Sequence, residues 1–198
     1  MKRIALVAAL AAAFAAPAFA QSSVTIYGRL NTSLEYQKDL PGAPADGDQW
    51  ALANNASRIG FKGVEDLGGG LKADFFLEHR FNSDNGAQTN PGAFWAGDSW
   101  VGLAGGFGWA RAGRITSAAY YATADYVSMH NHDTGNSEDK LYDYLIPNAN
   151  KLAYTSPNFG GVVLEAQYAL KESTPDSHDG IELAANYDAG PLPLGAGA

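Results

Sequence analysis

The sequence contains no cysteine among its 198 residues. A chain without cysteine has no disulfide bonds and no thiolate chemistry, so its stability must come from hydrogen bonding and packing. Basic residues are also scarce, because 13 lysines and arginines face 21 acidic residues and the formal net charge is −8. Since binding to a phosphate backbone needs a basic footprint, no nucleic-acid partner is expected.

Long apolar runs are missing after the first twenty residues. A helix that spans a bilayer needs about 20 apolar residues, so no helical span is expected beyond that point. The N-terminal segment begins with Lys2 and Arg3, continues with an apolar run and ends with Ala18 and Ala20. This pattern predicts a secretory signal peptide over residues 1–20, cleaved before Gln21. Its removal takes away two basic residues and moves the net charge of residues 21–198 from −8 to −10.

What the sequence has instead is a period-two alternation of apolar and polar residues. In residues 71–80, Leu71 and Leu77 fall on one face while Lys72 and Glu78 fall on the other, as side chains of a β-strand do. Trp100 interrupts the polar face of a later segment. The alternation predicts strands at residues 21–36, 57–64, 71–81, 94–104, 109–115, 151–156, 162–170 and 181–187, with a ninth beginning at residue 192.

The connections between these strands alternate in length. Those after the second, fourth, sixth and eighth strands are short and rich in glycine, whereas residues 37–56, 82–92, 116–150 and 171–180 are longer and polar. This alternation is typical of a transmembrane antiparallel up-and-down β-barrel, with short turns on one side and long loops on the other. The alternative is a soluble secreted β-sandwich that binds carbohydrate, since soluble sandwiches also have many short strands.

The sequence favours no enzymatic chemistry, no cofactor and no metal. It contains neither a nucleophile-elbow motif nor a phosphate-binding loop. A His-x-His-Asp motif at residues 130–133 lacks further ligands and a helix to fix it. Asp74 and Glu78 share a strand face and could suggest paired catalytic carboxylates. Because Lys72 and Arg80 flank them on that face, a salt-bridged wall is the better interpretation.

Four motifs in order along the chain carry a family resemblance. They are SVTIYG at residues 23–28, SRIGFKG with EDLGGGLKA at 57–73, WVGL with GFG and Gly113-Arg114 at 100–114, and YTSPNFGG at 154–161. Together they resemble the general diffusion porins of Gram-negative bacteria, specifically the trimeric porins of β-proteobacteria. The resemblance implies an outer-membrane, sixteen-stranded barrel that forms homotrimers in lipid and lets small hydrophilic solutes and ions diffuse passively.

The resemblance also assigns roles to charged residues. The family's third external loop folds into the pore, and residues 116–150 are expected to form it. The resemblance implies that loop acids oppose basic residues of the wall. The loop acids are Asp125, Asp133, Glu138, Asp139 and Asp143. The wall candidates are Arg29, Arg58, Lys62, Lys72, Arg80, Arg111 and Arg114. Asp74 and Glu78 are expected to face the pore as well. Arg114 occupies the family's Gly-Arg position, although the predicted strand gives it outward parity.

The predicted strands amount to about half of such a barrel. Residues 21–198 are therefore interpreted as the N-terminal portion of a porin domain, truncated at its C-terminus. A porin fragment without function is the further alternative, because a half barrel leaves two open sheet edges that lipid does not tolerate.

Overall fold

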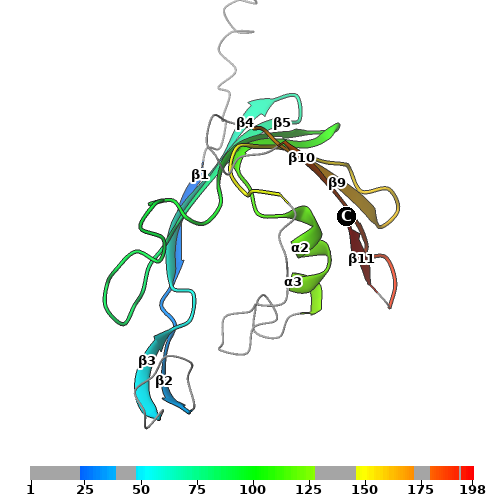
Figure 1. Ribbon diagram of the computed structural model, residues 1–198. Helices are drawn as coiled ribbons and strands as arrows, with labels where there is room; N and C mark the ends of the chain where they lie inside the picture. Colours follow the sequence, from blue (N-terminus) through cyan, green and yellow to red (C-terminus); the bar gives the residue numbers. More distant parts are fainter. Residues whose placement is uncertain (1–22, 39–47, 128–145, 172–178, 192) are drawn as a thin grey trace, which may run out of the picture.

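The protein is described by a computed structural model that covers residues 23–38, 48–127, 146–171, 179–191 and 193–198. Nine antiparallel strands form one curved sheet (Figure 1). Each strand is hydrogen-bonded to its neighbours in the order in which the strands are named next. They are β1 (Ser23–Arg29), β4 (Arg58–Gly68), β5 (Leu71–Arg80), β6 (Ser99–Gly105), β7 (Gly108–Arg114), β8 (Lys151–Thr155), β9 (Val162–Ala169), β10 (Gly180–Tyr187) and β11 (Leu194–Gly197). This order confirms the predicted all-β up-and-down topology, and β1 and β11 form the two edges of the sheet. The predicted signal peptide lies outside the described residues.

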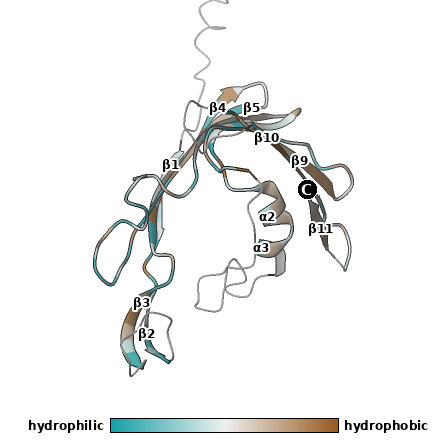
Figure 2. Ribbon diagram, in the orientation of Figure 1, coloured by the Kyte–Doolittle hydropathy of each residue, from teal (hydrophilic) through white to brown (hydrophobic). Residues whose placement is uncertain are grey.

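The convex face of the sheet is apolar and exposed. Ile26 and Ile181 are each 68% exposed, and Val101 is 64% exposed. Figure 2 shows hydrophobic stretches along β9 and β10. A β-sandwich would bury such a face against a second sheet, whereas here the nine strands belong to a single sheet. An exposed apolar band of this kind is the outer surface expected of a barrel in lipid.

The opening strand differs from the prediction because it is interrupted. Residues 30 and 31 separate β1 from β2 (Thr32–Gln37), and β2 pairs with β3 (Gln49–Asn54) in a separate two-stranded sheet. The prediction of a continuous loop over residues 37–56 is therefore wrong at β3. At the break, the Asn31 N–H donates to the hydroxyl of buried Ser57 (3.0 Å). This side chain replaces a strand partner for the Asn31 backbone.

The hairpin of β4 and β5 is tighter than predicted. Strand β4 continues through Gly68, so only the glycines at 68–70 make the turn that was predicted to begin at Glu65. All three have positive φ, between 63° and 83°, a conformation that glycine adopts without steric cost. The Asp66 carboxylate accepts the Gly68 N–H (2.8 Å) and stabilises the turn.

The long segment after β7 is not wholly irregular, contrary to the prediction. It contains two short helices, α2 (Ala118–Ala122) and α3 (Ala124–Val127). Figure 1 shows both inside the curve of the sheet. Among the described residues, no helix is long and apolar enough to cross a membrane.

Candidate functional site

Helix α2 packs directly on the concave face of the sheet. Ala119 and Ala122 are buried, and the strand opposite them carries glycine at the contact points. A Cβ atom on Gly195 of β11 would lie 1.8 Å from the carbonyl oxygen of Ala122, and one on Gly197 would lie 2.4 Å from the Cβ of Ala119. Glycine therefore allows helix and strand to approach within backbone contact.

A buried network fixes the start of α2 to the sheet. The Glu182 carboxylate of β10 accepts a hydrogen bond from the Ser117 hydroxyl and another from the Ala119 N–H (3.0 Å). The Ser117 hydroxyl also accepts the Tyr120 N–H (2.9 Å) and so caps the helix. These bonds satisfy N–H groups that a helix leaves without partners in its first turn.

A lysine balances the charge of this carboxylate. The Lys151 ammonium of β8 lies 3.5 Å from the second oxygen of Glu182 and donates to Gln167 (2.8 Å). Gln167 in turn donates to the carbonyl of Thr116 (3.0 Å). Lys151 and Glu182 are each 1% exposed, so the pair is removed from water. Residues 116–119 are thereby held to β8, β9 and β10 by polar groups that serve as one another's hydrogen-bond partners.

A second ion pair lies on the same face. Arg111 of β7 donates to Glu165 of β9 (2.7 Å) and to the Thr155 hydroxyl (3.1 Å). Its guanidinium also lies 4.0 Å from the centre of the Trp109 ring, within the range of a cation–π contact.

Three arginines stand side by side near the other edge of the sheet. The strand register places Arg29 of β1 opposite Arg58 of β4, and Arg58 opposite Arg80 of β5. Directly paired residues project to the same face. Glu78, which is 5% exposed, lies 3.9 Å from Arg58 and 2.9 Å from Arg80. We call Arg29, Arg58 and Arg80 the arginine row.

The Glu78 carboxylate also joins the row to β1, because its Oε2 atom accepts the Tyr27 hydroxyl (3.0 Å). Like charges placed side by side repel one another. Burying one carboxylate between Arg58 and Arg80 offsets part of that repulsion, and it fixes both side chains on the concave face.

The segment inside the curve approaches this row. The Asp98 carboxylate accepts the Thr116 N–H (2.9 Å) and hydroxyl (2.6 Å), which aligns the chain leading into α2. Desolvation raises the pKa of Tyr121 in α2 to about 12, and the nearby negative charge of Asp98 adds to the rise, while Arg80 opposes it. Asp125 in the first turn of α3 acts on Tyr121 in the same direction as Asp98. Arg80, Asp98 and Asp125 therefore each lie within electrostatic reach of Tyr121.

The remaining predicted site residues are spread along the wall. Lys62 lies over the Tyr27 ring (5.6 Å to its centre), and Lys72 is exposed near the hairpin turn. The Asp74 carboxylate accepts the Trp109 indole N–H (3.2 Å). Arg114 is paired with Ser99 in regular register and donates to the carbonyl of Ala96 (3.0 Å).

Part of the predicted site lies outside the residues that the structure describes. Four of the loop acids, Asp133, Glu138, Asp139 and Asp143, lie outside the described residues, as does the motif at residues 130–133. Conversely, sequence reasoning did not select Lys151, Gln167 and Glu182. The available signal was that Gln167 and Glu182 have inward parity on strands whose outward residues are apolar.

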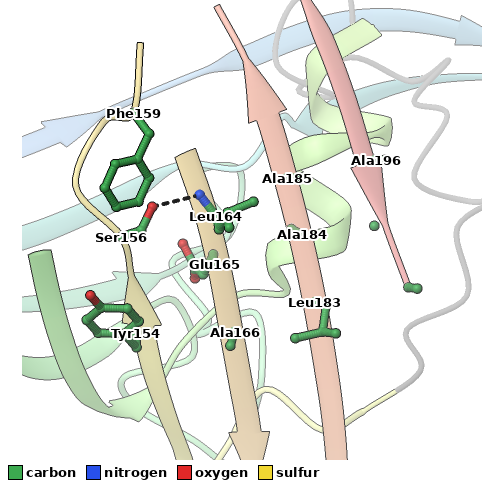
Figure 3. A pocket seen from close by; sticks show the side chains of 12 residues that line it. Tyr154, Ser156, Phe159, Leu164, Glu165, Ala166, Leu183, Ala184, Ala185 and Ala196 are labelled. Atoms are coloured by element: carbon green, nitrogen blue, oxygen red, sulfur yellow. Dashed lines mark hydrogen bonds between the residues drawn. The ribbon is translucent and has the colours of Figure 1, made fainter. Parts of the chain in front are cut away.

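An apolar hollow of about 660 Å³ lies at the β8–β11 end of the sheet. Figure 3 shows Tyr154, Leu164 and Leu183 around it, and the Ser156 hydroxyl accepts the Leu164 N–H (3.0 Å). These three side chains are exposed and belong to the outward set of β8, β9 and β10. The hollow therefore belongs with the apolar outer surface rather than with the charged concave face.

Comparison with known proteins places these features in context. The family model described as "Gram-negative porin" matches residues 5–198. The chain is 36% identical to "Outer membrane porin protein 32" of Delftia acidovorans, over 100% of this chain and 59% of that protein. It is 34% identical to "Major outer membrane protein P.IB" of Neisseria meningitidis serogroup B, over 89% of this chain and 51% of that protein.

A solved structure gives a similar match. The "Anion-selective porin from Comamonas acidovorans" shares 30% identity with a TM-score of 0.62, over 89% of this chain and 56% of that one. The chain thus spans about half the length of the curated relatives it matches.

Proposed function

This chain belongs to the Gram-negative porin family, and from that premise we propose that it forms the wall of a water-filled channel in the outer membrane. Small hydrophilic solutes and ions diffuse passively along the concave face. The observation that carries the proposal is the arginine row opposite the inward-folded segment. The comparisons give no support to a soluble carbohydrate-binding sandwich.

The mechanism is electrostatic and steric. Residues 115–127 narrow the space inside the curve, and Asp125 stands on that segment while the arginine row stands on the wall. Opposed charges across a narrow passage create a transverse field that orders permeating ions and dipolar solutes. Three arginines with one buried carboxylate give this part of the wall a net positive charge. We therefore infer that the wall attracts anions, a preference that the similar Comamonas acidovorans porin carries in its name.

Conductance across planar bilayers tests the channel. The full chain is expressed in a porin-deficient Gram-negative host and purified from the outer membrane. We expect discrete ohmic current steps in KCl, and a zero-current potential that moves towards cation preference in Arg58→Gln. Lys72→Gln, at the exposed hairpin end, serves as the control and should change the potential less. A membrane-inserted chain that gives no current steps would identify it as a fragment without channel function.

Further properties follow from the same family premise. We infer that residues 1–20 are cleaved before Gln21, and that the outer face contacts lipid and further copies of this chain in homotrimers. The exposed apolar convex face supports a lipid-facing or subunit-facing role. N-terminal sequencing of the purified protein tests the cleavage. Unheated gel electrophoresis tests the assembly, since a stable trimer migrates more slowly before heating than after it.

A further inference from the structure

Four aromatic side chains cross the concave face in an unbroken row. They are Tyr27 on β1, Phe76 on β5, Trp100 on β6 and Trp109 on β7, and we call them the aromatic row. Successive ring centres are 5.4, 5.7 and 5.1 Å apart, and no ring is fully buried. In barrels, aromatic residues are enriched outside, at the membrane interfaces, while the interior is polar. An aromatic row on the inner face therefore needs another explanation.

A hollow of about 460 Å³ opens beside three rings of this row, those of Phe76, Trp100 and Trp109. Its inward-facing lining includes Thr25, Lys62, Asp74, Phe76, Trp100 and Trp109. Its size falls within the range of roughly 300–1,000 Å³ that small-molecule sites occupy, and such sites typically combine apolar rings with a few polar groups.

The charged side chains in the lining of the hollow are one cation, Lys62, and one carboxylate, Asp74. Lys62 is exposed and lies over the Tyr27 ring, and within the described ranges it forms no ion pair. Asp74 already accepts the Trp109 indole N–H (3.2 Å), and Arg111 beside the row is paired with Glu165 (2.7 Å). The cation that remains available to a ligand is therefore the Lys62 ammonium.

We propose that the aromatic row and Lys62 form a binding site for aromatic carboxylates inside the channel. A flat ring contacts Phe76 and Trp100, while its carboxylate reaches Lys62. This inference rests on the proposed function and names a solute class for it. The arginine row lies at the opposite end of β4 and β5 from the glycine turn. An anion attracted there then meets the aromatic row further along the wall.

Binding is measured on the detergent-solubilised full chain by quenching of tryptophan fluorescence. The two probes are 4-nitrobenzoate and its neutral counterpart 4-nitrobenzamide. We expect saturable quenching by the carboxylate, with a half-saturation concentration roughly two- to fivefold lower than that of the amide, as for an exposed ion pair. Lys62→Met should remove this difference without disturbing a buried contact. Equal half-saturation of the two probes in the unmodified chain overturns the proposal.

A pair of matched substitutions tests the ring contact. Phe76→Leu removes a ring from the row, whereas Phe61→Leu makes the same change on the outward face of the neighbouring strand β4, away from the hollow. Half-saturation for 4-nitrobenzoate should rise roughly three- to tenfold in Phe76→Leu and stay unchanged in Phe61→Leu. Equal effects of the two substitutions contradict the site. Because binding is read without conductance, a chain that conducts but does not bind refutes this site alone, and one that binds but does not conduct refutes the channel alone.

Discussion

Replacing Lys151 with methionine removes the cation from a buried ion pair. The side chains of Lys151 and Glu182 are 0% and 2% exposed, so the substitution leaves a carboxylate with no counter-charge out of water. Removing one partner of such a pair costs about 3–5 kcal/mol. Glu182 keeps its hydrogen bonds from Ser117 and Ala119, so we expect about 3 kcal/mol, the lower end of that range.

The loss is measured as a shift of the thermal midpoint in detergent, followed by the circular dichroism of the sheet. For a chain of this size, 1 kcal/mol corresponds to about 2–4 °C, so Lys151→Met should lower the midpoint by about 6–12 °C at a fixed scan rate. The double variant Lys151→Met/Glu182→Gln buries no charge and should recover most of the loss. A shift below about 2 °C, which is what an exposed ion pair gives, refutes the reasoning. So does a double variant no more stable than the single one.

Three further predictions concern the inward segment. Gly195→Val should destabilise the fold by roughly 1–3 kcal/mol, because the added Cβ meets the Ala122 carbonyl. Ala196→Val, on the opposite face of the strand, should not destabilise it. Equal thermal midpoints for the two variants contradict the close packing of helix and strand. Since the pKa of Tyr121 is raised to about 12, its contribution to stability is complete below pH 10 and is lost as the pH rises through 12. Tyr121→Phe should therefore flatten the alkaline fall of the thermal midpoint, and an unchanged profile counts against the raised pKa. Neutralising the loop acids together should shift ion selectivity away from cations, and unchanged reversal potentials contradict their role.

The period-two alternation of apolar and polar residues predicted most of the fold. Ile26 and Val101 are apolar residues within the alternating segments, and both are exposed on the outer face. The alternation also placed Arg58, Arg80 and Glu78 on one face, where the structure shows them in contact. Alternation succeeds here because a strand between lipid and water needs opposite chemistry on its two faces.

Contacts between distant residues could not be predicted in this way. The break between β1 and β2 depends on the Ser57 hydroxyl, which bonds to Asn31 from 26 positions away. Lys151 and Glu182 are 31 positions apart, and the pairing of β8 with β9 and of β9 with β10 brings them together under α2. Helix α2 did have a local signal, since Ser117 precedes a run containing three alanines, and serine is a favoured N-cap residue.

The central claim is that the concave face lines a channel and the convex face does not, and single introduced thiols test it directly. The sequence has no cysteine, so Arg58→Cys and Ile59→Cys each carry one thiol, on adjacent residues of β4 that face opposite ways. A membrane-impermeant, negatively charged methanethiosulfonate is added during bilayer recording. We predict that the reagent lowers the current and raises the cation preference of Arg58→Cys channels, and that it leaves Ile59→Cys channels unchanged. An equal response of both variants, or a response of Ile59→Cys alone, would contradict the assignment of the two faces.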